Sequence, residues 1–273
     1  MNPQMNSQPP LRLALWSGPR NISTAMMRSW GNRPDTFVCD EPLYAHYLDA
    51  TGRDHPGARE VIAAGETDWR RAAAWLTGPV PEGKTIFYQK HMTHHLLPDM
   101  GRDWLGALTH GFLIRDPRAV IVSYIKKNRD PTVEDLGFVQ QAEIFDWVRG
   151  RTDVVPPVLE ARDVLDAPEP MLRRLCAAVG VDFLPAMLSW PPGLRPTDGV
   201  WAAHWYPEVE TSTSFRPART EGDPVPARLR GVYEQCLEPY QRLYAHRIQA
   251  QEPLPAASRL PSPVREGLKT RQE

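Results

Sequence analysis

The sequence is poor in cysteine, which excludes one large class of folds. Its 273 residues include only three cysteines, Cys39, Cys176 and Cys236, and each lies in an apolar stretch far from the others. An odd number at these spacings gives neither a disulfide framework nor a zinc motif. We therefore expect three reduced core residues.

Excess charge of one sign and long apolar runs are also missing. The chain carries 32 Lys and Arg against 33 Asp and Glu, a net charge of −1. Nucleic-acid binding is therefore not expected. No apolar run approaches the roughly twenty residues that a membrane helix needs. Residues 1–6 lack the basic and apolar regions of a secretory leader. We expect a cytoplasmic protein without a membrane partner.

One short segment carries the main functional signal. An apolar run at residues 11–15 leads into the sequence WSGPRNIST at residues 16–24, and a helix-like run follows at 25–30. A strand, a small-residue loop and a helix in this order aim backbone N–H groups and a helix dipole at an anion. Arg20 adds a cation, and Ser23 and Thr24 are expected to cap the helix and donate to phosphate oxygens. An ordinary capped turn is the alternative.

This segment is not a Walker A loop. The pattern G-x-x-x-x-G-K-[ST] cannot be written through residues 15–24, which hold one glycine, Gly18, and no lysine. An arginine precedes the hydroxyl pair instead. The sequence thus predicts a phosphate site of another kind.

A second segment supports an anion site. Residues 109–114 read as a buried strand that runs into Arg115, and Pro117 begins a helix that carries Ser123. In an open α/β sheet, ligands bind at the carboxyl ends of the strands. Arg115 and the loop at 17–24 are therefore expected to face one ligand.

These motifs resemble those of sulfotransferases that use 3′-phosphoadenosine 5′-phosphosulfate (PAPS). The segment at 18–24 is similar to the family's 5′-phosphosulfate loop, and Arg115 with Ser123 to its 3′-phosphate motif. A third match spans residues 158–165 and the helix-like stretch at 168–175. The resemblance implies that the PAPS-binding residues are Gly18, Pro19, Arg20, Asn21, Ile22, Ser23, Thr24, Arg115 and Ser123. It also implies that no metal is needed and that Arg20 assists catalysis.

Two residues compete for the role of general base. Glu41 follows the predicted strand at 36–39 and resembles the catalytic glutamate of carbohydrate sulfotransferases. His91 follows the predicted strand at 85–89 and aligns with the catalytic histidine of cytosolic sulfotransferases, but its lysine partner has moved to Lys90. A base needs a pKa near the working pH, which favours histidine unless burial raises that of glutamate. We favour Glu41.

Strands that alternate with helices predict the fold class. The expected strands, at residues 11–16, 36–39, 85–89, 109–115 and 157–160, are separated by helical stretches. This order favours a doubly wound, mainly parallel α/β sheet of the P-loop-like sulfotransferase type. We expect a loose end at 1–10, one domain at 11–250 and a disordered tail at 251–273.

The sequence leaves the acceptor open among alcohols, sugars, phenols and amines, and it leaves the oligomeric state open. Trp201, Trp205 and Tyr206 are expected to be mainly core residues, and the family's adenine-contacting tyrosine is replaced by Ala161. Two other functions compete with sulfuryl transfer. They are an ATP-dependent P-loop phosphotransferase and a nucleotide-binding protein without turnover.

Overall fold

A computed structural model describes residues 9–152, 154–217 and 223–251. Its strands are β1 (Leu11–Ser17), β2 (Thr36–Asp40), β3 (Ile86–Met92), β4 (Thr109–Ile114) and β5 (Val158–Glu160). They form one sheet in the order β2-β3-β1-β4-β5, and every neighbouring pair is parallel. The predicted parallel α/β fold is confirmed.

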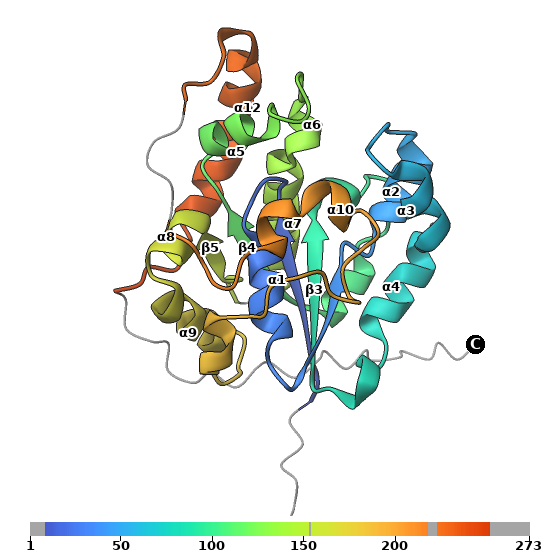
Figure 1. The fold of residues 1–273 in the computed structure, drawn as a ribbon, viewed down its shortest axis with the longest axis vertical. Coiled ribbons are helices and arrows are strands. Elements are labelled where there is room, and N and C mark those ends of the chain that lie inside the picture. The colour runs from blue at the N-terminus through green and yellow to red at the C-terminus, as the bar shows by residue number, and fades with distance from the viewer. Residues whose placement is uncertain (1–8, 153, 218–222, 252–273) are drawn as a thin grey trace, which may run out of the picture.

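Helices cover both faces of the sheet (Figure 1). The helices are α1 (Ser23–Gly31), α2 (Tyr44–Thr51), α3 (Ala58–Ala64), α4 (Trp69–Thr77), α5 (Pro117–Tyr124), α6 (Val133–Leu136), α7 (Phe138–Arg151), α8 (Ala161–Asp166), α9 (Pro168–Ala178), α10 (Ala202–Trp205), α11 (Pro207–Glu210) and α12 (Arg230–Tyr244). Short 3₁₀ turns are η1 (Pro81–Gly83), η2 (Thr93–His95), η3 (Asp103–Ala107), η4 (Pro185–Leu188) and η5 (Ala227–Leu229).

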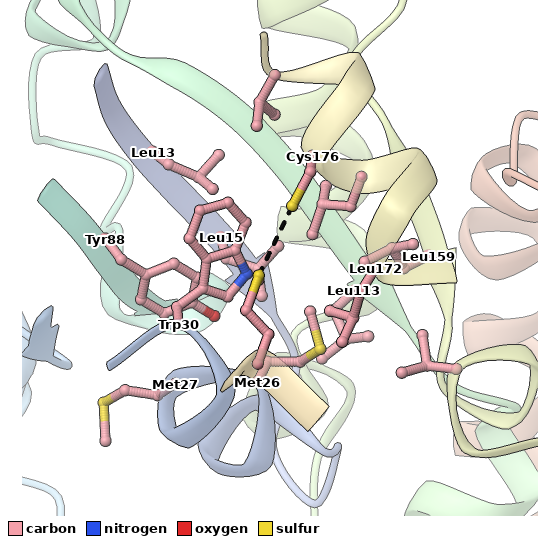
Figure 2. Packing of buried hydrophobic residues seen from close by; sticks show 14 of the residues in the cluster. Leu13, Leu15, Met26, Met27, Trp30, Tyr88, Leu113, Leu159, Leu172 and Cys176 are labelled. Atoms are coloured by element: carbon pink, nitrogen blue, oxygen red, sulfur yellow. Dashed lines mark hydrogen bonds between the residues drawn. The ribbon is translucent and has the colours of Figure 1, made fainter. Parts of the chain in front are cut away.

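Alternation along β1 sends apolar side chains to two cores. Leu13 and Leu15 pack against α1 and α9 on one face, and Figure 2 shows Trp30 and Cys176 in this cluster. Trp16 points to the opposite face, where α4, α7 and α12 pack. Because both faces of β1 are covered, its apolar run is almost continuous. The arrangement is doubly wound, as expected.

The predicted elements differ from the observed ones in a few places. β3 extends to Met92, three residues beyond the predicted end at residue 89. Ser23 and Thr24 do not cap α1: the cap position is Ile22, and no side chain accepts a hydrogen bond there. The predicted tail and loose N-terminus lie almost wholly outside the described residues, so the domain division stays a prediction. None of the described helices has the length and apolarity to cross a bilayer.

Candidate active site

The loop after β1 is built for a close approach of backbone to backbone. A Cβ on Gly18 would lie 2.7 Å from the carbonyl oxygen of Leu136, so only glycine fits there. Asn21 closes the loop: its side-chain amide donates to the carbonyl of Leu113 at 3.0 Å, and its oxygen accepts from the N–H of Ile22 at 2.9 Å. The loop is thereby fixed to the end of β4.

The first turn of α1 leaves donors available. The first hydrogen bond into the helix runs from the N–H of Met26 to the carbonyl of Ile22 at 3.0 Å. The N–H groups of Ser23, Thr24 and Ala25 precede this bond, so they have no partner within the helix. Since the hydroxyls of Ser23 and Thr24 do not cap α1, they too are left for another acceptor. The helix dipole favours an anion at this point.

Two arginines from separate loops meet beside this turn. The Nε of Arg20 donates to the hydroxyl of Ser123 on α5 at 3.1 Å, and Arg115 donates to the carbonyl of Arg20. Within the described residues, neither guanidinium forms an ion pair with a carboxylate. Burial lowers the pKa of Arg115 and the positive charge of Arg20 lowers it further, while the carboxylates of Glu160, Asp116 and Glu208 oppose this shift. The structure therefore brings Arg20, Arg115 and Ser123 together, as the sequence predicted.

Strained backbone marks two of the three candidate catalytic residues, Arg20 and Glu41. Among the described residues, Arg20 and Glu41 have positive φ angles of 55° and 41°, and the third non-glycine residue of this kind is Glu82 in a short turn. Such conformations cost of order 1–3 kcal/mol and persist where the surroundings enforce them. The N–H of Glu41 donates to the carbonyl of Lys90 at 2.9 Å, which holds the residue at the end of β2.

Lys90 organises the charges around Glu41. Its ammonium group, 1% exposed, donates to Asp40 at 2.8 Å, to Glu41 Oε1 at 2.5 Å and to the Tyr206 hydroxyl at 2.7 Å. Tyr206 in turn donates to Asp40 at 2.7 Å. Burial raises the pKa of Glu41, and Asp40 adds to this rise while Lys90 opposes it. The pKa of Lys90 is raised well above its ordinary value, because its two carboxylates outweigh burial.

His91 lies on the other face of the sheet. Because β3 continues to Met92, His91 is inside the strand, which corrects the expectation that it follows the strand end. Period-two alternation places it opposite Lys90. Its ring stacks on Trp16 with centroids 4.3 Å apart, and its Nε2 lies 3.2 Å from the side-chain oxygen of Gln89. Burial lowers its pKa to about 3. The structure does not bring His91 and Glu41 together.

A hollow of about 460 Å³ opens beside Glu41. Its walls come from α3, α4 and the segment at 198–201, and they are mainly apolar, with Val61, Trp75 and Trp201 among them. Glu66 and Arg71 supply further polar groups. The hollow gives a small molecule of moderate size access to the Glu41 carboxylate.

The segment at 198–201 ties this hollow to the last turn of α1. Asp198 pairs with the buried Arg28 of α1 through two hydrogen bonds, and the N–H of Gly199 donates to Asp40 at 3.3 Å. Trp201 and Tyr206 are buried, so the expectation that aromatic residues here are mainly core is confirmed for both. Tyr206 also has the polar role described above.

Sequence reasoning missed Lys90, Asp40 and Tyr206 as members of the site. A signal for Lys90 required extending the predicted strand beyond residue 89, because a lysine inside a buried strand needs a carboxylate partner. Asp40, next to Glu41, was the obvious candidate for that partner. Tyr206 lies 116 residues from Lys90, and no local pattern connects them. Among the described residues, no cluster of His, Cys, Asp and Glu side chains is arranged to hold a metal ion.

The geometry is that of an α/β protein with unpaired backbone donors and two arginines after β1 and β4, and with the Glu41 carboxylate beside a hollow of about 460 Å³. A sulfotransferase domain model matches residues 11–248, and the chain belongs to this family. Membership supports sulfuryl transfer as the general reaction.

Two curated relatives come from Arabidopsis thaliana. Branched-chain-amino-acid aminotransferase-like protein 1 is 32% identical over 234 residues, and protein 2 of the same name is 31% identical over 231 residues. Each match covers 85% of this chain and 41% of the relative, so the chain spans about two fifths of their length.

Solved structures of sulfotransferases are also similar. The sulfotransferase domain of the Synechococcus PCC 7002 olefin synthase is 17% identical, with a TM-score of 0.48, and the match covers 86% of this chain and 97% of that one. The sulfotransferase domain from the curacin biosynthetic pathway is 15% identical, with a TM-score of 0.45 and coverage of 92% and 95%.

Proposed function

We propose that this protein transfers a sulfuryl group from PAPS to a hydroxyl or amine acceptor. The observation that carries the proposal is the convergence of Arg20 and Arg115 at the strand ends, where the Arg115 guanidinium donates to the Arg20 carbonyl and neither guanidinium forms an ion pair with a carboxylate among the described residues. Two buried or half-buried cations repel each other unless an anion joins them. A nucleotide with phosphates at both the 5′ and 3′ positions supplies two anionic groups, one for each arginine.

The two parts of the PAPS molecule are assigned to two sets of residues. The loop at 18–22 and the free donors of Ser23 and Thr24 hold the 5′-phosphosulfate. Arg115 and Ser123 hold the 3′-phosphate. Arg20 lies between the two and stabilises the negative charge that develops on the leaving oxygen.

Glu41 acts as the general base in this proposal. The acceptor oxygen attacks sulfur, the bond from sulfur to the 5′-phosphate oxygen breaks, and the proton of the acceptor passes to Glu41. Burial raises the pKa of Glu41 toward the working range of a base. Its carboxylate borders the hollow of about 460 Å³, which we assign to the acceptor. His91 faces the opposite core, which argues against a direct role.

A screen with sulfur-labelled PAPS and a metabolite extract tests the proposed reaction. We expect a labelled product in the absence of added metal, and the Arg20→Ala variant to lose it. A magnesium-dependent transfer of phosphate from labelled ATP would support a phosphotransferase instead. Nucleotide binding with no labelled product over a broad acceptor panel would support a binding protein without turnover.

A further inference from the structure

His95 lies next to the carboxylate oxygen of Glu41 that Lys90 does not hold. Lys90 donates to Glu41 Oε1 at 2.5 Å, while the Nδ1 of His95 lies 4.0 Å from Oε2. Both side chains are nearly enclosed, with 2% of His95 and 11% of Glu41 exposed. Glu41 therefore has a titratable neighbour in addition to Lys90 and Asp40.

The Nδ1 atom of His95 is buried and has no hydrogen-bond partner among the described residues. Buried polar atoms in folded proteins are nearly always paired, so an orphan of this kind needs an explanation. The distance to Glu41 Oε2 exceeds a hydrogen bond by about 1 Å. A small movement of the carboxylate therefore satisfies both atoms.

The histidine ring is held in place by α2. It stacks on Tyr44 with centroids 4.6 Å apart and planes at 4°, and on Tyr47 with centroids 4.8 Å apart and planes at 29°. Two stacked rings restrict tilting of the imidazole out of its plane. The edge that carries Nδ1 therefore stays beside Glu41.

Burial keeps this ring neutral. It lowers the pKa of His95 well below the ordinary value, and four basic groups near the ring act in the same direction. These groups are His94, His55, Lys90 and His91. A neutral imidazole carries one N–H, and a carboxylate beside Nδ1 favours the tautomer with the proton on Nδ1.

We propose that His95 is a positioning residue for Glu41, whose Nδ1–H donates to Oε2 so that Lys90 and His95 together fix both carboxylate oxygens. The inference rests on the proposed function, in which Glu41 takes the acceptor's proton. The terminal torsion of a glutamate is broad, so a carboxylate held by one oxygen can rotate. With both oxygens held, Oε2 keeps a second lone pair free for that proton.

Nitrogen-15 NMR of the histidine rings in the full chain tests the pairing without PAPS or acceptor. We expect the Nδ1–H tautomer for His95, assigned by loss of its signals in His95→Asn, and a shift toward Nε2–H in Glu41→Ala. His110 is the matched control, because its Nδ1 accepts from the indole N–H of Trp16 at 3.0 Å and should stay unprotonated in both proteins. An Nε2–H tautomer of His95 in the unchanged protein, or no response to Glu41→Ala, overturns the proposal.

A pair of variants tests the consequence for turnover. Asparagine at position 95 can still donate an N–H, whereas leucine cannot, and hydrolysis of PAPS to sulfate is the probe reaction. We expect His95→Asn to stay within about threefold of the wild-type kcat, and His95→Leu to lose about 10- to 100-fold, with KM for PAPS unchanged. Equal losses in both variants overturn the positioning role. The tautomer is read without PAPS, so its failure is distinct from a failure of the sulfuryl-transfer proposal.

Discussion

At the ends of β1 and β4, the guanidinium groups of Arg20 and Arg115 lie together with no carboxylate pair among the described residues. At the ends of β2 and β3, by contrast, Asp40 and Glu41 enclose the ammonium group of Lys90. The first region has two guanidinium groups without an ion pair, and the second has one ammonium group between two carboxylates. In the proposed function, an anionic ligand completes the first region, and Glu41 of the second region is the reacting carboxylate.

The two regions also differ in how the chain builds them. The region around Arg20 uses consecutive residues of one loop and the start of α1. Arg115 and Ser123 are added from the end of β4 and from α5. The Glu41 side joins β2 and β3 with Tyr206, which lies 116 residues beyond Lys90. Substitutions should therefore separate binding of the nucleotide from chemistry.

The largest expected effect is on turnover in Glu41→Gln. This change keeps the shape but removes the proton acceptor, so the rate should fall by about 10²–10⁴-fold. Affinity for 3′-phosphoadenosine 5′-phosphate should barely change, because Glu41 lies at the end of β2 and not in the loop that we assign to the nucleotide. Single-turnover kinetics at saturating PAPS measure the rate. His91→Asn is the parallel variant and should cost less, and a dead His91→Asn beside a near-normal Glu41→Gln would reverse the assignment.

Burial of Glu41 also predicts how the stability of the protein changes with pH. Because its pKa is raised in the folded protein, the native state binds the proton more tightly than the unfolded chain does. Stability is therefore lost as pH rises from the unfolded pKa through the folded one. Glu41→Gln removes this pH-dependent loss, so the unfolding free energy of the variant should fall less than that of the wild type as pH rises from acidic to neutral values, measured by urea unfolding at several pH values.

The next effect in size is on nucleotide affinity in Arg20→Ala. Loss of a charged, partly buried hydrogen-bond donor should weaken binding of 3′-phosphoadenosine 5′-phosphate by about 2–4 kcal/mol. Calorimetry on the folded variant measures the change. Arg12→Ala, a variant that removes a guanidinium from the same strand–loop segment, is the control and should bind normally. Unchanged affinity in Arg20→Ala would contradict the assignment of this loop to the nucleotide site.

A smaller effect is expected on selectivity in Arg115→Ala and Ser123→Ala. Each should reduce the preference for 3′-phosphoadenosine 5′-phosphate over adenosine 5′-phosphate, by about 1–3 kcal/mol for the charged residue and less for the serine. The ratio of the two dissociation constants is the readout. If the ratio survives in both variants, the 3′-phosphate is bound elsewhere.

The last prediction concerns the pH dependence of stability that arises from the buried histidines of the turn after β3. Burial lowers the pKa of His94 to about 3, so the unfolded chain binds the proton first as pH falls below about 6.5. Stability is lost between these two values, by up to about 1.4 kcal/mol per pH unit for one histidine. His94→Gln should flatten the slope of unfolding free energy between pH 6.5 and pH 5, measured in urea. The exposed His204→Gln is the matched control, and an equal slope in both variants contradicts the account.

The same comparison shows what the sequence could predict. Gly18, Arg20 and Arg115 could be predicted as neighbours from the sequence, because the carboxyl ends of parallel strands meet at one edge of a sheet. Glu41 could be predicted for the same reason, because it is the first residue after β2. Short-range patterns were sufficient where the site is built from strand ends.

Other parts of the site depend on details that a sequence pattern does not contain. His91 was misplaced because β3 runs to Met92, and inside a strand each side chain's face is decided by alternation. Ser23 and Thr24 were expected to cap α1, but the helix begins at Ser23 and the cap falls on Ile22. The contact of His95 with Glu41 depends on the turn after β3, which brings two distant segments together.

Calorimetric titration of the full chain without metal tests the central claim most directly. The account predicts that 3′-phosphoadenosine 5′-phosphate binds at least tenfold more tightly than adenosine 5′-phosphate, since each charged hydrogen bond to the extra phosphate contributes about 1.5–3 kcal/mol. It also predicts that magnesium and ATP together bind more weakly than the 3′-phosphorylated nucleotide. Tight binding of ATP that requires magnesium, with no binding of 3′-phosphoadenosine 5′-phosphate, would contradict it.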